Sequence, residues 1–221
     1  MDNLKKKKLE EELKKYGNYK YENELIDGGI KYICGVDEVG RGPLVGPVVA
    51  AAVILPINFK LDGLTDSKKL SEKKRNEYDK LIKENALAYA IGEVSNEVID
   101  EVNIYEATKM AMIMAINKLN IKPEHVLIDA MHLDIDIPTT SIIKGDLKSL
   151  SISAASVIAK VYRDSIMYEL DKKYPFYDYK KNKGYPTKEH IEALYKYGKT
   201  KLYRQTFKPV YLIDKEIEDE V

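Results

Sequence analysis

Apolar residues gather in two neighbouring runs in the first quarter of the chain, over residues 30–39 and 47–55. Both runs are rich in Val, Ile and Ala, and a turn with the sequence GRG lies between them. Short apolar runs bounded by turn residues are typical of buried strands, so the pattern predicts two strands joined as a hairpin. Three later apolar runs predict further strands over residues 86–94, 126–130 and 140–144.

Apolar residues at helical spacing predict helices between and after these strands. Ser71, Asn103 and Thr187 are of the residue types that cap helix N-termini, and Pro175 is placed to end the longest helix. The predicted helices cover residues 71–84, 103–119, 151–173 and 187–198.

The beginning of the chain is dense in Lys and Glu. An amphipathic helix that ends near Gly17 is predicted by four residues at roughly helical spacing, Leu4, Leu9, Leu13 and Tyr16. We therefore expect a short helical N-terminal appendage over residues 1–28 and one larger domain over residues 29–221 with a helical region at its C-terminal end. Because the strands come first as a meander and then alternate with helices, the fold class is α/β, with a mixed sheet flanked by helices.

The composition is that of a globular protein. Of the 221 residues, 44% are hydrophobic, which is enough for a sizeable core. Cys34 is the only cysteine, so no disulfide forms within the chain, and its apolar surroundings predict a buried, inert thiol. No secretory signal and no stretch long enough to cross a bilayer is recognisable, so we expect a cytoplasmic protein without membrane contact.

The charges balance but are unevenly placed. Lys plus Arg and Asp plus Glu both number 36, so the formal net charge is zero, which argues against binding nucleic acid by bulk positive charge. Basic clusters nevertheless lie at residues 5–8, 68–74 and 172–183, and residues 214–220 are acidic. A neutral total is compatible with a basic groove beside an acidic metal site.

Acidic residues stand where three of the apolar segments end. They are Asp37 with Glu38, then Asp129, then Asp146. Strand ends in an α/β sheet converge on the edge where ligands bind, so these carboxylates are expected to share one site. Four hard oxygen donors without a His or Cys cluster indicate Mg²⁺ or Mn²⁺ rather than zinc. Two such ions activate a water molecule and stabilise the leaving oxygen of a phosphodiester.

Neighbouring residues on a regular strand face opposite sides of the sheet, so Asp37 and Glu38 share a site only if the backbone departs from regular geometry there. The histidines lack metal-ligand spacing and are expected at the surface or in loops: His125, His132 and His190. No G-x-S-x-G elbow and no Walker motif occurs. The two glycines of GRG allow backbone N–H groups to approach a phosphate or a sugar beside the acids.

These motifs together resemble ribonuclease HII, the type 2 ribonuclease H family with the ribonuclease H-like fold. The resemblance covers residues 32–209, and several long motifs follow one another in the family's order. They are VDEVGRGPLVGPVVAAAVIL at 36–55, DSKKLSEKKR at 66–75, NIYEATKMAM at 103–112, LIDA at 127–130, KGD at 144–146, SISAASVIAKVYRD at 151–164 and KGYPT at 183–187.

The resemblance assigns roles to individual residues. It implies that four acids hold two divalent ions: Asp37, Glu38, Asp129 and Asp146. It implies that the loop of Gly40, Arg41 and Gly42 senses the ribonucleotide 2′-hydroxyl, and that Tyr185 stacks on the sugar at the RNA–DNA junction. A 2′-hydroxyl both donates and accepts hydrogen bonds, so backbone groups and a tyrosine can recognise it without reading base sequence.

Further residues are expected to contact backbone phosphates: Lys68, Lys69, Lys144, Lys160, Ser151, Ser153 and Ser156. For Ser153 and Ser156, packing of small residues along a helix is an equal alternative. Asp164, beside Arg163, is expected in a structural ion pair, with a role at the site as the alternative. Four positions depart from the residues usual in the family: Ala130, Asn182, Pro186 and Tyr203. None is a predicted ligand, although Pro186 bears on the presentation of Tyr185.

The activity implied is a metal-dependent endonuclease that hydrolyses RNA in RNA–DNA hybrids and cuts 5′ of single ribonucleotides embedded in duplex DNA, leaving a 5′-phosphate and a 3′-hydroxyl. Mn²⁺ or Mg²⁺ is the expected cofactor, and a monomer is expected. Two alternatives stay open, a catalytically idle duplex-binding module and a ribonuclease H-like nuclease with another substrate. For residues 1–28, extra duplex affinity through residues 5–8 and a plain capping helix are both open.

Overall fold

Five strands form one mixed sheet in the order β3-β2-β1-β4-β5 in this computed structural model, which describes residues 18–61, 63–64 and 70–214. Their bounds are β1 Ile33–Val39, β2 Val48–Ile54, β3 Ala88–Val94, β4 His125–Asp129 and β5 Thr139–Ile142. β2 pairs antiparallel with both β1 and β3, whereas β4 pairs parallel with both β1 and β5. The predicted hairpin and the predicted mixed sheet are both confirmed.

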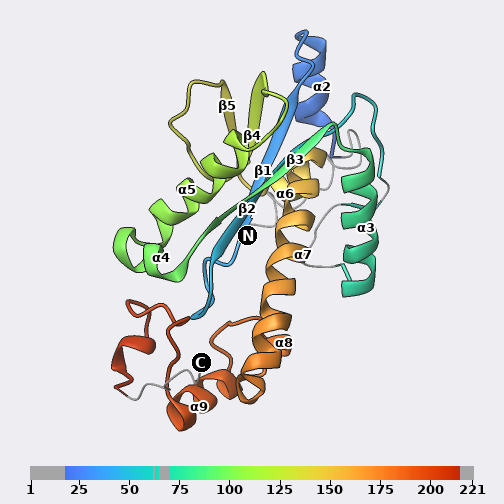
Figure 1. Cartoon of the computed structure of the whole chain (residues 1–221). Helices are drawn as coiled ribbons and strands as arrows, with labels where there is room; N and C mark the ends of the chain where they lie inside the picture. Colours follow the sequence, from blue (N-terminus) through green and yellow to red (C-terminus); the bar gives the residue numbers. More distant parts are fainter. Residues whose placement is uncertain (1–17, 62, 65–69, 215–221) are drawn as a thin grey trace, which may run out of the picture.

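Helices cover both faces of the sheet (Figure 1). Their bounds are α2 Lys20–Asp27, α3 Glu72–Asn85, α4 Asn96–Val102, α5 Ile104–Asn117, α6 Gly145–Lys148, α7 Leu150–Lys173, α8 Tyr179–Asn182 and α9 Lys188–Tyr197, with 3₁₀ turns at Pro175–Tyr177 and Val210–Leu212. α4 and α5 pack on one face, while α3 and the long α7 pack on the other. No helix in the described ranges is long and apolar enough to cross a bilayer.

The predicted helix starts agree with the capping contacts. Ser71 Oγ accepts a hydrogen bond from the Lys74 amide, and Thr187 Oγ1 accepts one from the His190 amide. The Asn103 side chain caps α5 in the same way. α7 begins one residue earlier than predicted, because its cap is Ser149, whose Oγ accepts from the Ile152 amide. The short helices α2 and α4 were not predicted.

Alternation along the strands divides the core into two layers. Cys34 and Val36 face α5, and Cys34 is fully buried, as predicted. Burial raises the pKa of its thiol to about 12. Val49 and Ala51 face α7. The contact between α7 and β1 is close, since a Cβ atom at Gly35 would lie 2.0 Å from the carbonyl carbon of Ser151. Only glycine at position 35 permits this approach.

A third apolar cluster lies beyond the sheet and is formed by the chain after α7. Tyr177, Tyr179 and Tyr203 are buried there, around His190. The prediction that His190 lies at the surface or in a loop is therefore wrong. His190 is fully buried in α9 because its ring is surrounded by aromatic side chains and both ring nitrogens have hydrogen-bond partners.

The predicted N-terminal helix lies outside the described residues. Within the described part, α2 packs through Tyr21, Leu25 and Ile26 against a small cluster that contains Ile33 of β1 and Ile152 of α7. α2 is thus continuous with the core of the domain. The predicted boundary at residue 28 stays a prediction.

Candidate active site

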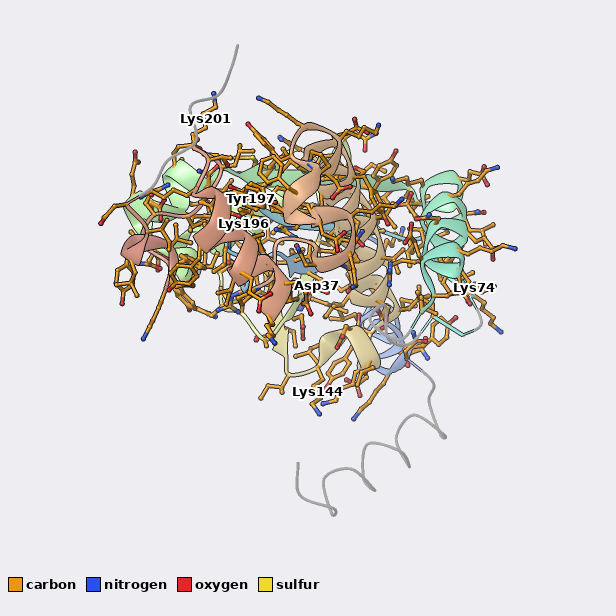
Figure 2. All side chains as sticks on the ribbon, turned by 90° about the horizontal axis from the view of Figure 1, so that it is seen from below. Asp37, Lys74, Lys144, Lys196, Tyr197 and Lys201 are labelled. Carbon is orange, nitrogen blue, oxygen red and sulfur yellow. The ribbon has the colours of Figure 1, made fainter. Side chains whose placement is uncertain are left out.

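Two predicted site residues lie at the carboxyl ends of adjacent parallel strands. β1 and β4 are in register from Ile33 with His125 to Val36 with Ile128, and the next residues along are Asp37 and Asp129. Because residues in register share a face, both carboxylates point to the side of α7. Figure 2 views this end of the molecule and places Asp37 near its centre.

Asp37 is a buried carboxylate in an acidic environment, with 5% of its surface exposed. Burial is the largest cause that raises its pKa well above the usual range, followed by the charges of Glu38 and Asp129. Hydrogen bonds from the Ser156 side chain and from the Glu38 amide act in the opposite direction. The Glu38 amide donates to Asp37 Oδ1 over 2.8 Å. Asp37 and Asp129 are therefore close enough to repel each other when both are ionised.

Asp146 approaches the same strand ends from α6. The amide of Gly145 donates to Asp129 Oδ1 over 2.7 Å, so α6 begins directly against the end of β4. Lys144 turns the chain into α6 with a left-handed backbone conformation, at φ +59. Asp146 itself is 8% exposed, and its carbonyl accepts from Ser153 Oγ over 2.6 Å. These contacts place Asp146 next to the strand end that carries Asp129.

Glu38 follows the regular alternation of β1. β1 pairs with β2 without interruption through Val39, so in the described chain this edge of β1 shows no departure from regular strand geometry. Such a departure is what would allow Asp37 and Glu38 to share one site. Glu38 Oε1 lies 3.6 Å from Nη1 of Arg41 in a salt bridge. After burial, the negative charge of Glu38 is the next cause that raises the pKa of Asp37.

Among the described residues, no three Asp, Glu, His or Cys side chains are arranged as a metal site. The donor chemistry nevertheless fits a divalent cation. Asp37 and Asp129 are hard oxygen donors on one face of the sheet, and a cation between them would relieve the repulsion that raises the Asp37 pKa. Glu38 would join them at a cation only if the backbone departs from regular strand geometry there. The ligand role of the four acids stays a prediction.

The loop between β1 and β2, loop 40–47, packs against the turn that carries Tyr185. Gly40 has φ +96, and a Cβ atom at Gly42 would lie 3.2 Å from Cε1 of Tyr185. The Leu44 amide donates to the Gly184 carbonyl over 2.8 Å. Tyr185 remains 40% exposed. The two segments predicted to recognise the 2′-hydroxyl are therefore in contact, although 143 to 145 residues separate Tyr185 from Gly42 and Gly40.

The aromatic cluster around His190 holds the backbone of Tyr185. His190 Nδ1 lies 2.8 Å from the Tyr185 carbonyl, which only accepts, so Nδ1 carries the proton. Nε2 then accepts from the Tyr203 hydroxyl over 2.8 Å. Burial lowers the pKa of His190, which keeps the ring neutral in this arrangement. Asn182 also binds this turn, because its Oδ1 accepts from the Gly184 amide.

The family follows from the comparison with known proteins. Residues 34–211 match the family model described as Ribonuclease HII. The chain belongs to the ribonuclease HII family. It is therefore an enzyme of the ribonuclease H type. Ribonuclease HII of Bacillus cytotoxicus is 57% identical over 206 residues, which are 93% of this chain and 80% of that protein.

Solved structures of relatives have the same fold. The ribonuclease H2 of Pyrococcus horikoshii superposes with a TM-score of 0.71 at 26% identity, over 82% of this chain and 96% of the other. Ribonuclease HII of Archaeoglobus fulgidus, solved in complex with PCNA, gives a TM-score of 0.67 at 26% identity, over 80% of this chain and 95% of that one. The ribonuclease H-like fold expected from the sequence is confirmed.

Three of the other predicted substrate contacts, Ser151, Ser153 and Lys160, have partners within the protein. The Ser151 amide donates to Glu22 Oε1, and Ser153 Oγ donates to two carbonyls. Lys160 forms an ion pair with Asp164 over 2.7 Å, so the ion pair expected for Asp164 exists, with Lys160 as its partner. Lys144 is exposed, and Lys68 and Lys69 lie outside the described residues. Their contacts with phosphates stay predictions.

Two buried arginines were missed by the sequence reasoning. Arg163 of α7 donates to the carbonyls of Pro47, Val45 and Lys183. Arg204 donates to carbonyls of loop 40–47. A buried arginine whose partners are backbone carbonyls leaves no motif in the sequence, because any residue type supplies a carbonyl.

One cavity of about 450 Å³ lies at the opposite end of β1, beside Ile33, Leu55 and Glu22. None of the four predicted acids lines it. The cavity is thus separate from the acidic strand ends.

Proposed function

We propose that the protein is a metal-dependent endonuclease that hydrolyses RNA in RNA–DNA hybrids and cuts 5′ of a single ribonucleotide embedded in duplex DNA. The observation that carries the proposal is the order of residues along the end of β1 and the loop that follows it. Asp37 is followed within five residues by Gly42, which packs against Tyr185. Carboxylates for hydrolysis and a surface for a 2′-hydroxyl are thus joined on one short segment.

The residues that would hold metal ions are Asp37, Glu38, Asp129 and Asp146. Divalent ions bound there, Mn²⁺ or Mg²⁺, supply a water of lowered pKa and stabilise negative charge on the departing oxygen. Ser156 and the Glu38 amide orient the Asp37 carboxylate, and the Gly145 amide orients that of Asp129. Fixed carboxylates need no reorganisation when a substrate arrives.

Substrate recognition is assigned to the contact between loop 40–47 and Tyr185. Backbone groups of Arg41 and Gly42 would bind the 2′-hydroxyl, and the exposed Tyr185 ring would stack on the sugar. Hydrolysis breaks the bond between phosphorus and the 3′-oxygen. Water supplies the new oxygen on the 5′-phosphate, and the 3′-oxygen leaves as a hydroxyl after it takes up a proton. The role we propose is removal of misincorporated ribonucleotides and RNA primers.

The test uses labelled duplex DNA with one ribonucleotide, an all-DNA duplex and a long RNA–DNA hybrid, each with Mg²⁺ or Mn²⁺. We expect a single cut 5′ of the ribonucleotide, absent from the all-DNA duplex and absent with chelator. Cleavage of the long hybrid alone would overturn the assignment of Gly40, Arg41, Gly42 and Tyr185. Binding without cleavage would favour the duplex-binding module, and cleavage of the all-DNA duplex a nuclease with another substrate.

A further inference from the structure

Arg204, in the chain after α9, is fully buried, and its guanidinium lies against loop 40–47. Its Nη2 donates to the carbonyls of Gly40 and Gly46, over 2.6 and 2.9 Å. Its Nη1 donates to the carbonyls of Arg41 and Pro43, over 3.1 and 2.8 Å, and Nε donates to Gly46 over 3.0 Å. One guanidinium therefore binds four carbonyls of a single loop.

The backbone of the same segment adds two further contacts. The Arg204 amide donates to the Leu44 carbonyl, and Val45 forms a β-bridge with Tyr203. Burial, followed by the charge of Arg163, lowers the pKa of Arg204 to about 9, and Asp100 acts in the opposite direction. A pKa near 9 leaves the guanidinium charged at neutral pH, so all its N–H groups remain donors.

Residues Tyr203 and Arg204 bind both parts of the predicted 2′-hydroxyl site. Arg204 binds loop 40–47, whereas the Tyr203 hydroxyl donates to His190, which in turn holds the Tyr185 carbonyl. Two adjacent residues near the end of the described chain thus support both segments. Within the described residues, Asp100 anchors the following Gln205 and Thr206 through their amides.

The guanidinium also determines which groups of the loop face outward. The carbonyls of Gly40 and Arg41 point inward to Arg204, while Arg41 and Gly42 are exposed residues. In the described part of the chain, the Arg41 and Gly42 amides have no hydrogen-bond acceptor. Exposed amides without an acceptor are available to a substrate hydroxyl. A lysine cannot replace the arginine fully, because an ammonium offers three donors rather than a planar fork of five.

We propose that Arg204 is a positioning residue for 2′-hydroxyl specificity, which holds the carbonyls of loop 40–47 inward so that the Arg41 and Gly42 amides face the sugar. The inference rests on the proposed function, because it assigns a cause to the selectivity of that site. Arg204 does not touch the substrate in this account. It acts through the conformation of the loop.

The test compares wild type with Arg204→Lys on two duplexes, which carry at one position either a ribonucleotide or its 2′-fluoro analogue. The fluorine is a poor acceptor and has no proton to donate. In Arg204→Lys we expect the ratio of kcat/KM on the ribonucleotide duplex to kcat/KM on the 2′-fluoro duplex to fall by about fivefold or more. This is the scale of one lost hydrogen bond. Met112→Ala, which removes a fully buried side chain of α5 remote from the loop, is the matched control.

A purely structural role predicts a different result. Loss of folded enzyme lowers both rates by one factor and leaves their ratio unchanged, as we expect for Met112→Ala. An unchanged ratio in Arg204→Lys would overturn the proposal.

Amide hydrogen exchange tests the conformational step without activity. We expect faster exchange in loop 40–47 of Arg204→Lys with unaltered exchange in β4, and equal exchange in the loop would overturn the inference. Wild-type enzyme could cleave both duplexes with the same kcat/KM while the loop exchanges faster in the variant. The proposed recognition of the 2′-hydroxyl would then be wrong. Arg204 would then hold the loop without setting specificity, and this inference would be overturned as well.

Discussion

Asp37 combines burial with two acidic neighbours, and this combination is costly for a residue without a counter-charge. Its pKa is raised by burial first, and then by Glu38 and Asp129. Proteins retain such groups mostly at functional positions. At the scale of one residue, the acidic end of β1 is therefore better explained by chemistry than by stability.

The first prediction concerns Asp37→Asn. Because the amide keeps the shape of the side chain and removes its charge, we expect kcat on the ribonucleotide duplex to fall by at least about 10²-fold while duplex affinity changes little. Single-turnover cleavage and equilibrium binding measure the two effects separately. Glu84→Gln in α3, remote from the strand ends, serves as the control. Unimpaired cleavage by Asp37→Asn would remove Asp37 from the metal site.

The second prediction concerns Gly42→Ala. The new Cβ atom would lie 3.2 Å from the Tyr185 ring, so the ring has to shift. We expect kcat/KM for the ribonucleotide duplex to fall by about tenfold, from misplacement of one contact. Tm should change little because both residues are exposed. Tyr185→Ala in the same background should add no further loss if both changes act on one contact, whereas additive losses would separate them.

At the scale of elements, α7 connects the two ends of the sheet. Its N-terminus is capped by Ser149, whose hydroxyl also donates to Glu22 Oε1 of α2 over 2.6 Å. Glu22 accepts in addition from the Ser151 amide, over 2.9 Å. A carboxylate at the positive end of a 24-residue helix is favourably placed. α2 therefore stabilises the helix that supplies Ser156 to Asp37.

The third prediction concerns this cap. Ser149→Ala removes the cap and one donor to the buried Glu22, so we expect the free energy of unfolding to fall by about 2 kcal/mol. Ser71→Ala, which removes the exposed cap of α3, should cost only about 0.5–1 kcal/mol. Urea unfolding of both variants measures the difference. Equal losses would show that the contact with Glu22 contributes nothing.

The elements also show which features of the structure can be predicted from the sequence. Capping depends on neighbours within three residues, so the caps at Ser71, Asn103 and Thr187 were predictable. The environment of His190 was not, because Tyr203 and Tyr177 reach it through the tertiary fold. The strand ends that carry Asp37 and Asp129 were predictable from the apolar runs. Contacts of Arg204 with carbonyls were not, since carbonyls carry no sequence signal.

At the scale of the whole molecule, the chain after α7 returns to the β1–β2 connection. The aromatic cluster around His190 stabilises this return, and α8 and α9 lie at the end of the sheet remote from α2 (Figure 1). The substrate surface that we propose therefore depends on the packing of a separate cluster. Loss of that cluster would affect recognition before it affects the sheet.

The fourth prediction is a pH dependence of stability. Burial lowers the pKa of His190 in the folded state, whereas the unfolded value is about 6.5. The unfolded state then binds the proton more readily, so stability is complete above about pH 6.5 and is lost as the pH falls below it. Denaturant unfolding between pH 7.5 and 5 should show a loss of up to about 1.4 kcal/mol per pH unit from this group.

Two variants test whether His190 causes this pH dependence of stability. His190→Gln should reduce the slope, because the side chain no longer titrates. His132→Gln, at an exposed histidine, should leave it as in wild type. A slope that persists in His190→Gln would place the titrating group elsewhere.

The contact of Arg204 with Gly40 joins residues 164 positions apart. During synthesis the β1–β2 hairpin leaves the ribosome first, whereas the guanidinium that completes its loop emerges only after the chain has grown by a further 164 positions beyond Gly40. The sheet can begin to form in the nascent chain, but the surface that we propose recognises a ribonucleotide cannot take its final form before Arg204 has emerged. A chain that stops short of Arg204 would carry the acids that we propose are catalytic without the selectivity that we assign to loop 40–47.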